Sequence, residues 1–414
     1  MLALCDCNSF YTSAERVFAP QFINQPVIVL SNNDGCVVAR SPEAKAIGIK
    51  IGVPVFQIQD LIYQHKVQVF SSNYSLYGDM SQRVMSTLAE FTPTLEVYSI
   101  DESFLDLSGF GHLDLIEYGH EIRQVVRQWT GIPVSIGISS TKTLSKVANH
   151  LAKLSDDGVS LLNPENTEKF LVDFPVEEIW GIGRSHSRSL ANHGINTALQ
   201  LRDVDLSWAR KEYSVLMQRL VLELRGQPCF SLELNPPPKK SITVSRSFSR
   251  AIATLAELRE AIATYTSRAA EKLRQHELTA DAIQVFALTS RFKADYYSDS
   301  VTLTLDYSSD NTAEILRFAL KGCDRIYRPE LQFKKAGVIL LGLMPKSQRQ
   351  LSLWEPEEGR SDALMQTIDA INERFGRGTI QFAVAGLEKP WAMRQEMRSN
   401  RWTTCWSEIP VVRS

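Results

Sequence analysis

The sequence predicts a multidomain α+β protein. Within residues 1–165, apolar runs with the alternation of β-strands are mixed with amphipathic helices around a hairpin, an order typical of a largely antiparallel sheet with helices. The three consecutive prolines in residues 235–240 (NPPPKK) lack backbone donors and predict a stiff linker. Beyond them, residues 241–345 alternate strands with two helices, which predicts a small sheet backed by helices. A chain of 414 residues is long enough for two to four such domains.

The elements of residues 1–165 follow from periodicity and from cap residues. Strands are expected at MLALCDC, PVIVLS, CVVA, LEVYSIDESFLDL and PVSIGIS, with a DG turn between the second and the third. A short helix is expected after Ser41, an N-cap residue, with Pro42 at its first position and Gly48 beyond its end. Longer helices are expected at residues 80–90, 115–129 and 143–153.

The remaining segments are expected to form three further regions. Residues 166–235 predict a small helical domain, in which residues 174–195 form a helix, a two-glycine hairpin and a second helix. Residues 241–345 predict helices at 255–277 and 312–327 with strands at AIQVFAL, VTLTLDY and AGVILLGLM. Residues 346–414 begin as a polar connector and continue with an amphipathic helix, one face of which holds Leu364, Ile368, Ile371 and Phe375.

Composition excludes several classes of protein. With 44% apolar and 22% charged residues, the balance is that of a globular protein. No apolar run reaches the length of a membrane span and no basic region precedes the first apolar residues, so we expect a cytoplasmic protein without a membrane partner. The six cysteines form no CxxC pair, which argues against a disulfide framework and a zinc ribbon. Cys5 and Cys7 are expected to be small packing residues.

Charge is unevenly distributed along the chain. The net charge is −2, but residues 239–349 hold 18 Lys and Arg against 12 Asp and Glu, whereas residues 1–238 hold 19 against 26. A basic block of +6 is expected of a surface that binds a polyanion, and an acidic block is expected to hold cations. Chance variation between domains is the alternative.

Asp101 and Glu102 are adjacent carboxylates inside a predicted strand. They point to opposite faces of an ideal strand, so one shared site requires a turn or a bulge there. A buried carboxylate needs a cation, and Asp6, at the end of the first strand, is a third residue of this kind. Three such carboxylates suit two Mg²⁺ ions about 3.5–4 Å apart, which is an arrangement for nucleotidyl transfer. The alternative is an exposed hairpin end with ordinary surface acids.

Two further patterns suggest contacts with phosphates. The predicted helix at 143–153 and the residue before it place Lys142, Lys146, Asn149 and Lys153 off the apolar stripe, which suits a triphosphate or, alternatively, a solvated helix face. The glycines Gly181 and Gly183, followed by Arg184, resemble a helix-hairpin-helix motif, in which backbone N–H groups approach a DNA phosphate. Any tight corner between helices uses glycine as well.

Taken together, the chain resembles the Y-family translesion DNA polymerases, and among them the UmuC branch. The resemblance spans essentially the whole chain and rests on LALCDCNSFY, VLSNNDGCVVAR, FSSNYSLY, YSIDESF, TKTLSKVANH, VEEIWGIGR, LRGQPC, SRSFS, RAAEKLR and KKAGVIL. It implies a right-hand polymerase with a palm and small fingers in 1–165, a helical thumb in 166–235, a little-finger domain in 241–345 and a UmuC-like C-terminal extension in 346–414.

The resemblance also implies roles for single residues. Asp6, Asp101 and Glu102 match the catalytic carboxylates that bind two Mg²⁺ ions, with the carbonyl of Cys7 as a further ligand. Tyr11 matches the steric gate, whose ring excludes a ribose 2′-hydroxyl. The other nucleotide-binding positions are Phe10 at the sugar and Lys153, Arg40 and Lys45 toward the triphosphate.

Two segments differ from the usual family pattern. Many Y-family enzymes have tyrosine and arginine on the short fingers helix, where this chain has Pro42 and Lys45; a lysine keeps the charge but loses the bidentate fork of arginine. QLSLW resembles the peptide that binds the bacterial sliding clamp, with Trp354 in place of phenylalanine. The clamp-binding residues are expected to be Gln350, Leu351, Leu353 and Trp354.

The implied activity is error-prone translesion synthesis, in which dNTPs are added to a primer 3′-hydroxyl opposite damaged template in DNA repair and the SOS response. The implied partners are primer-template DNA, a processed UmuD-type dimer, the RecA filament and the sliding clamp. Two alternatives remain: a nucleotidyl cyclase, for which a sheet with paired carboxylates is also suited, and a non-catalytic regulator of recombination that binds DNA and RecA.

Overall fold

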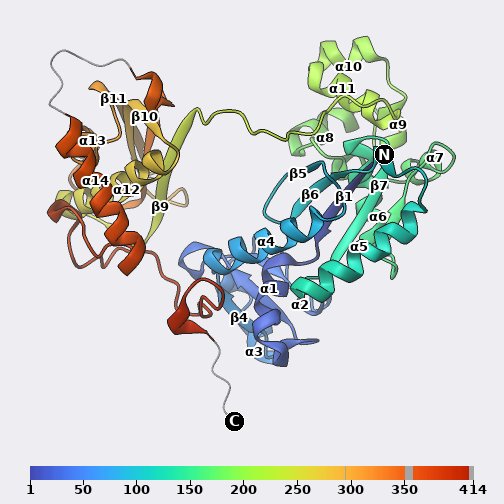
Figure 1. Cartoon of the computed structure of the whole chain (residues 1–414), viewed down its shortest axis with the longest axis horizontal. Coiled ribbons are helices and arrows are strands. Elements are labelled where there is room, and N and C mark those ends of the chain that lie inside the picture. Colours follow the sequence, from blue (N-terminus) through green and yellow to red (C-terminus); the bar gives the residue numbers. More distant parts are fainter. Residues whose placement is uncertain (294, 350–357, 410–414) are drawn as a thin grey trace. The chain divides into compact units, whose positions relative to one another are not determined.

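The computed structural model describes residues 1–293, 295–349 and 358–409, the side chains of 358–361 excepted. Contacts within the chain define two compact units, and the boundary in the proline linker falls between Pro236 and Pro237 (Figure 1). Within the described residues, no helix is both long and apolar enough to cross a membrane. The units comprise residues 1–31, 35–236 and 396–414 (unit 1) and residues 32–34 and 237–395 (unit 2).

The core of unit 1 is a five-stranded sheet in which all neighbours are antiparallel except the last pair. Helices α4 and α5 pack on the face that bears the cysteines of β1, and α6 packs on the face that bears Asp6. The strands, in sheet order, are β5 (Leu95–Val97), β6 (Glu102–Asp106), β1 (Leu2–Cys7), β7 (Val134–Ser139) and β8 (Val159–Leu161). The helices are α4 (Tyr74–Leu88), α5 (Leu115–Thr130) and α6 (Lys142–Leu154).

Helix α6 lies unusually close to β7 because Gly137 has no side chain. A Cβ at Gly137 would lie 2.0 Å from the backbone nitrogen of Asn149 and 2.4 Å from the carbonyl oxygen of Ser145. The Asn149 side chain donates to the carbonyls of Leu4 (3.2 Å) and Ser135 (2.7 Å). These contacts fix α6, and with it Lys146 and Lys153, over the end of β1.

Unit 1 contains a second, three-stranded sheet. Its order is β3-β2-β4, with β2 (Val27–Leu30) antiparallel to β3 (Val37–Arg40) and parallel to β4 (Gln68–Ser71), a strand that the sequence did not predict. The turn expected at DG is a longer loop in which Asn33 (φ 62°) and Asp34 (φ 51°), not glycine, adopt positive φ. The helices here are α1 (Phe10–Phe18), α2 (Pro42–Ala46), which Ser41 caps as predicted, and α3 (Gln59–Gln64).

A helical segment completes the main chain of unit 1. The prediction of a helix before the two glycines is wrong, because only a 3₁₀ turn, Val176–Glu178, forms there. The segment between Pro175 and Gly181 is too short for an α-helix. The hydrophobic core of this helical segment also includes apolar side chains of α6. The helices are α7 (Thr167–Leu171), α8 (Arg184–Asn192), α9 (Ala198–Arg202), α10 (Leu206–Glu212) and α11 (Val215–Leu224).

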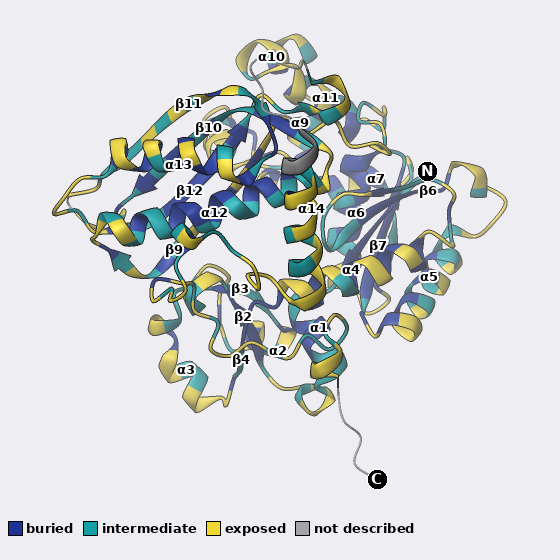
Figure 2. Cartoon of the chain, turned by 60° about the vertical axis from the view of Figure 1, so that its left-hand side comes forward, coloured by how far each residue is buried: buried dark blue, intermediate teal, exposed yellow. Residues whose placement is uncertain are grey.

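Unit 2 contains an antiparallel sheet of order β11-β10-β12-β9, and α12 and α13 bury their inner faces against it (Figure 2). The long strand β9 was not predicted. Trp391 is 2% exposed and packs in the same core. The elements are β9 (Ser241–Ile252), α12 (Leu255–Gln275), β10 (Leu278–Leu288), β11 (Ser298–Ser309), α13 (Thr312–Ile326), β12 (Phe333–Leu341), β13 (Met344–Pro345) and α14 (Glu358–Phe375).

The apolar face predicted for α14 is only partly correct, because Ile368 and Ile371 are half-buried and the other two residues are exposed. Leu364 and Phe375 of the expected apolar face are 56% and 66% exposed, whereas the neighbouring Met365 is buried. Salt bridges rotate the helix, because Asp369 binds Arg274 at 2.6 Å and Asp362 binds Lys346 at 2.9 Å.

Candidate active site

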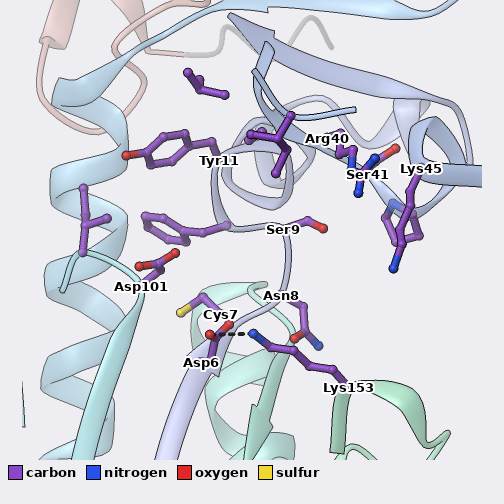
Figure 3. A pocket seen from close by; sticks show the side chains of 16 residues that line it. Asp6, Cys7, Asn8, Ser9, Tyr11, Arg40, Ser41, Lys45, Asp101 and Lys153 are labelled. Atoms are coloured by element: carbon purple, nitrogen blue, oxygen red, sulfur yellow. Dashed lines mark hydrogen bonds and ion pairs between the residues drawn. The ribbon is translucent and has the colours of Figure 1, made fainter. Parts of the chain in front are cut away.

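A pocket of about 680 Å³ lies in unit 1, between the end of β1 and the helix α2 (Figure 3). This volume is typical of a site for a small molecule such as a nucleotide. Tyr11 and Asp101 lie on one side of it, and Arg40 and Lys45 lie on the other. It is lined by Asp6, Cys7, Asn8, Ser9, Phe10, Tyr11, Val38, Ala39, Arg40, Ser41, Pro42, Lys45, Ile51, Ile100, Asp101 and Lys153.

Three carboxylates lie at the end of β1 and at the start of β6. Asp6 and Glu102 are direct partners across the antiparallel pair, so their side chains are on the same face of the sheet. Asp101 lies in the turn before β6, where its carbonyl accepts a 2.8 Å hydrogen bond from the N–H of Cys7. Ser99 stabilises the turn, since its hydroxyl donates to Oδ1 of Asp101 at 2.6 Å. Adjacent acids thus approach one region because the backbone turns.

Asp6 is 8% exposed and forms an ion pair with Lys153. The distance from Nζ of Lys153 to Oδ2 of Asp6 is 2.6 Å (Figure 3). Burial raises the pKa of Asp6 to about 6, although the ammonium of Lys153 opposes this rise. A carboxylate in this environment needs a cation when it is ionised.

Glu102 forms a second ion pair. Nζ of Lys146 lies 2.9 Å and 3.1 Å from its two carboxylate oxygens. The same ammonium lies 4.5 Å from the ring centre of Tyr98 and 5.7 Å from that of Trp180. The two rings are linked, because the indole N–H of Trp180 donates to the hydroxyl of Tyr98 at 3.0 Å. Lys146 is therefore held both by a carboxylate and by cation–π contacts.

The predicted basic stripe on α6 is partly wrong. Lys142 is 4% exposed and pairs with Glu96 at 2.5 Å, and Asn149 is 2% exposed and binds strand carbonyls. Both residues are structural, because α6 is covered on one side by the sheet and on another by the core of the helical segment. Only Lys146 and Lys153 lie beside the carboxylates.

Tyr11 lies over the end of the pocket near Asp101. Its ring stacks on Tyr77 at 4.4 Å between centres and 13° between planes, and it lies perpendicular to the ring of Tyr74 at 6.1 Å between centres. Phe10 is buried beside it, at 5.7 Å between ring centres. Tyr77 and Tyr74 were not predicted as site residues. Their rings pack against Tyr11 from another helix, and such a contact leaves no local pattern in the sequence.

The basic residues on the opposite side differ in their freedom to contact a ligand. Arg40 donates to the carbonyl of Ile49, so part of its guanidinium is engaged in the protein. Lys45 is on α2 and lines the pocket. Pro42 is the first residue of the same helix and also lines the pocket, to which its ring offers no hydrogen-bond donor.

The described residues contain no group of three His, Cys, Asp or Glu side chains close enough to form a metal site as they stand. Each of the three carboxylates accepts a hydrogen bond from a protein side chain: Asp6 from Lys153, Asp101 from Ser99 and Glu102 from Lys146. The thiol of Cys7 is buried, and all six cysteines are free. The donor set nevertheless fits a hard divalent cation, since it consists of carboxylate oxygens around a buried acidic position.

The two glycines are arranged as a tight corner. Gly181 has φ 90°, and Gly183 is the N-cap of α8, whose first residue is Arg184. No side chain caps this helix, and a Cβ at either glycine would meet nothing within 4 Å. The backbone at the corner is therefore accessible. The predicted clamp-binding residues 350–354 lie outside the described residues.

Sequence comparison assigns most of the chain to known families. The impB/mucB/samB family matches residues 5–150, its C-terminal domain matches residues 239–353, and a domain of unknown function (DUF4113) matches residues 362–412. The protein UmuC of Salmonella typhimurium is 43% identical over 99% of this chain and 99% of its own length. DNA polymerase IV 2 of Mesorhizobium japonicum is 28% identical over 95% of this chain and 96% of its own length.

Structural comparison agrees with this assignment. A Y-family DNA polymerase chimera superposes with a TM-score of 0.68 over 83% of this chain and 99% of its own, at 20% identity. The predicted multidomain α+β fold is thus confirmed. The chain belongs to the UmuC, ImpB, SamB and MucB family of Y-family translesion DNA polymerases, and is a DNA-directed DNA polymerase.

Proposed function

We propose that this polymerase adds dNTPs to a primer 3′-hydroxyl opposite damaged template by two-metal nucleotidyl transfer, with low fidelity, in DNA repair and the SOS response. The observation that supports this proposal most directly is the placement of Asp6, Asp101 and Glu102 at neighbouring strand ends, with Asp6 and Asp101 lining a nucleotide-sized pocket. A pure regulator of recombination has no need of three carboxylates at one strand end.

Asp6, Asp101 and Glu102, with the carbonyl of Cys7, are the residues that would hold two Mg²⁺ ions. Bound Mg²⁺ would supply charge stabilisation for the attacking and leaving oxygens. Lys153 and Lys146 already neutralise Asp6 and Glu102, which supports a cation requirement at both positions. Lys153 would exchange the carboxylate of Asp6 for triphosphate oxygens, because its side chain is 41% exposed and lines the pocket.

Tyr11 would select deoxyribonucleotides by exclusion. Its ring is held against Tyr77, and Phe10 lies beside it. A rigid ring next to the sugar rejects a 2′-hydroxyl through steric overlap. On the other side of the pocket, Lys45 and the part of Arg40 not bound to Ile49 would contact the triphosphate.

DNA would be bound outside the pocket by two regions. At the corner formed by Gly181, Gly183 and Arg184, an uncapped helix N-terminus offers backbone N–H groups to a phosphate, which is the chemistry of a helix-hairpin-helix thumb. The basic excess of residues 239–349 suits a little-finger domain that follows the DNA backbone. Palm and fingers would then occupy 1–165, the thumb 166–235, the little finger 241–345 and the extension 346–414.

The family relationship also suggests partners. We include a processed UmuD-type dimer, the RecA filament and the sliding clamp, the last through residues 350–354, with action in the cytoplasm at the nucleoid. These partners rest on the sequence resemblance alone.

Primer extension on an undamaged template tests the metal site. Asp6→Asn and Glu102→Gln keep the size of each side chain and remove its charge, so extension with Mg²⁺ is expected to fall at least about 100-fold, while binding of primer-template DNA is retained. Asp79→Asn is the matched control, because Asp79 is an acid on α4 that pairs with Arg83 at the surface. Equal extension by all three variants would refute the carboxylate assignment.

A further inference from the structure

The C-terminal segment 396–409, named the strap here, packs in unit 1 beside β4 and the start of α4 (Figure 1). Two hydrogen bonds with Ser71 join it to the end of β4. The N–H of Ser71 donates to the carbonyl of Met397 at 3.0 Å, and the N–H of Met397 donates to the hydroxyl of Ser71 at 3.0 Å. The strap therefore continues the hydrogen bonding of a buried strand end.

The strap also binds the residue that caps α4. Asn73 is 2% exposed, and its Oδ1 accepts from the N–H of Leu76 at 3.4 Å. Its Nδ2 faces three strap oxygens: the carbonyl of Ser399 (3.1 Å), the hydroxyl of Ser399 (2.9 Å) and the carbonyl of Asn400 (3.1 Å). One amide thus connects the first turn of α4 with the strap.

A third contact reaches α1. Glu15 is 1% exposed and accepts a hydrogen bond from the hydroxyl of Tyr77 at 2.7 Å. Burial raises the pKa of Glu15, and the hydrogen bond from Tyr77 acts in the opposite direction. The strap residue Trp402 stacks on Phe18 of the same helix, at 6.2 Å between ring centres and 18° between planes.

These contacts converge on the ring of Tyr11. Tyr11 and Glu15 are four residues apart on α1, and Tyr77 of α4 bridges them: its ring stacks on Tyr11 and its hydroxyl binds Glu15. Ser399 binds Asn73, which caps α4, and Trp402 of the strap stacks on Phe18 of α1. The strap therefore contacts both helices that position the Tyr11 ring: it hydrogen-bonds to the cap of α4 and stacks on α1.

We propose that the strap positions the steric gate, with Ser399 acting through Asn73 and the first turn of α4, which carries Tyr77, to hold the Tyr11 ring at the depth that excludes a 2′-hydroxyl. The inference rests on the proposed function, because that function gives Tyr11 its role. Steric selection depends on small displacements, and misplacement by about 1 Å changes rates by about 100-fold in enzyme sites. The proposal assigns a function to the C-terminal part of the domain of unknown function that matches residues 362–412.

The test measures binding by the full-length chain on a primer-template whose primer ends in a dideoxynucleotide, so that no chemistry follows. The apparent Kd of the correct dNTP and of the matching rNTP is determined with Mg²⁺ for wild type, Ser399→Ala and Tyr77→Phe. We expect the ratio of rNTP Kd to dNTP Kd to fall about 3- to 10-fold in both variants, the scale of one lost hydrogen bond. Ser399→Thr, which keeps the hydroxyl, should restore the ratio.

Two controls separate the possible outcomes. Ser407→Ala removes an exposed hydroxyl from the same strap and should leave the ratio at the wild-type value. Tyr11→Ala should abolish the discrimination. A wild-type ratio in both Ser399→Ala and Tyr77→Phe, with discrimination lost in Tyr11→Ala, would overturn the strap proposal alone. A wild-type ratio in Tyr11→Ala would overturn the assignment of the gate, and with it the role of the strap.

Discussion

The ammonium of Lys153 lies 2.6 Å from Oδ2 of Asp6, the buried acid at the end of β1. A few residues away on the same helix, Lys146 binds Glu102. The protein therefore neutralises two candidate metal ligands with its own cations. This arrangement limits the repulsion between neighbouring carboxylates, and it makes each lysine a competitor for any cation that the carboxylates would bind.

Lys153→Gln is expected to have opposite effects on metal and nucleotide. Removal of a cation next to Asp6 strengthens binding of Mg²⁺ by the nucleotide-free protein. The same change removes a charge-assisted contact with the triphosphate, so KM for dNTP rises by about 10-fold. Calorimetric titration with Mg²⁺ at pH 8 and steady-state insertion kinetics measure the two effects.

Lys169→Gln serves as the control, because Lys169 is on α7 and outside the pocket that contains Asp6. Weaker Mg²⁺ binding by Lys153→Gln together with an unchanged KM would contradict the role given to Lys153.

Lys142→Ala is expected to destabilise the protein by about 3–5 kcal/mol, since it leaves Glu96 buried without its cation. Both side chains are 5% exposed, and the carboxylate also accepts from the N–H of Glu233 at 2.8 Å. Denaturant unfolding of the full chain measures the effect. Arg83→Ala breaks an exposed i,i+4 pair and should cost no more than about 1 kcal/mol. Equal losses in the free energy of unfolding for the two variants would show that the buried ion pair contributes no more to stability than the exposed one.

Glu15→Gln is expected to change how stability depends on pH. The folded pKa of Glu15 is raised above its ordinary value of 4.5, so between the two values the folded chain keeps a proton that the unfolded chain has lost. The contribution of Glu15 to the free energy of unfolding is therefore complete below pH 4.5 and is lost as the pH rises through the folded pKa.

Unfolding curves at several pH values test this. The stability of Glu15→Gln relative to wild type should increase as the pH rises above 4.5 and then level off. If the difference in unfolding free energy between Glu15→Gln and wild type stays constant or decreases as the pH rises, the folded protein does not raise the pKa of Glu15.

The convergence of the carboxylates could be predicted only in part. Adjacent acids within an apolar alternation indicate a turn, and the structure has one between β5 and β6. The register that pairs Asp6 with Glu102 depends on contacts almost a hundred residues apart in the sequence, which periodicity does not contain. The resemblance to a family supplied that link.

The errors on α6 and α14 have a common physical reason. Helical periodicity separates apolar from polar side chains but does not say which polar residues meet partners. Lys142 is buried because β5 supplies Glu96, and α14 is rotated because Arg274 and Lys346 bind its acids. Tertiary ion pairs thus override the orientation that residue type alone favours.

Primer extension past an abasic site is the most direct test of the catalytic assignment. The full chain, supplied with a UmuD-type dimer, a RecA filament, the clamp, Mg²⁺ and dNTPs, is compared with Asp101→Ala in the same mixture. We predict that the wild type extends the primer past the lesion and that the variant, although folded and bound to DNA, does not. Equal extension by the variant, or no extension by either folded and DNA-bound protein, would contradict catalysis at Asp101.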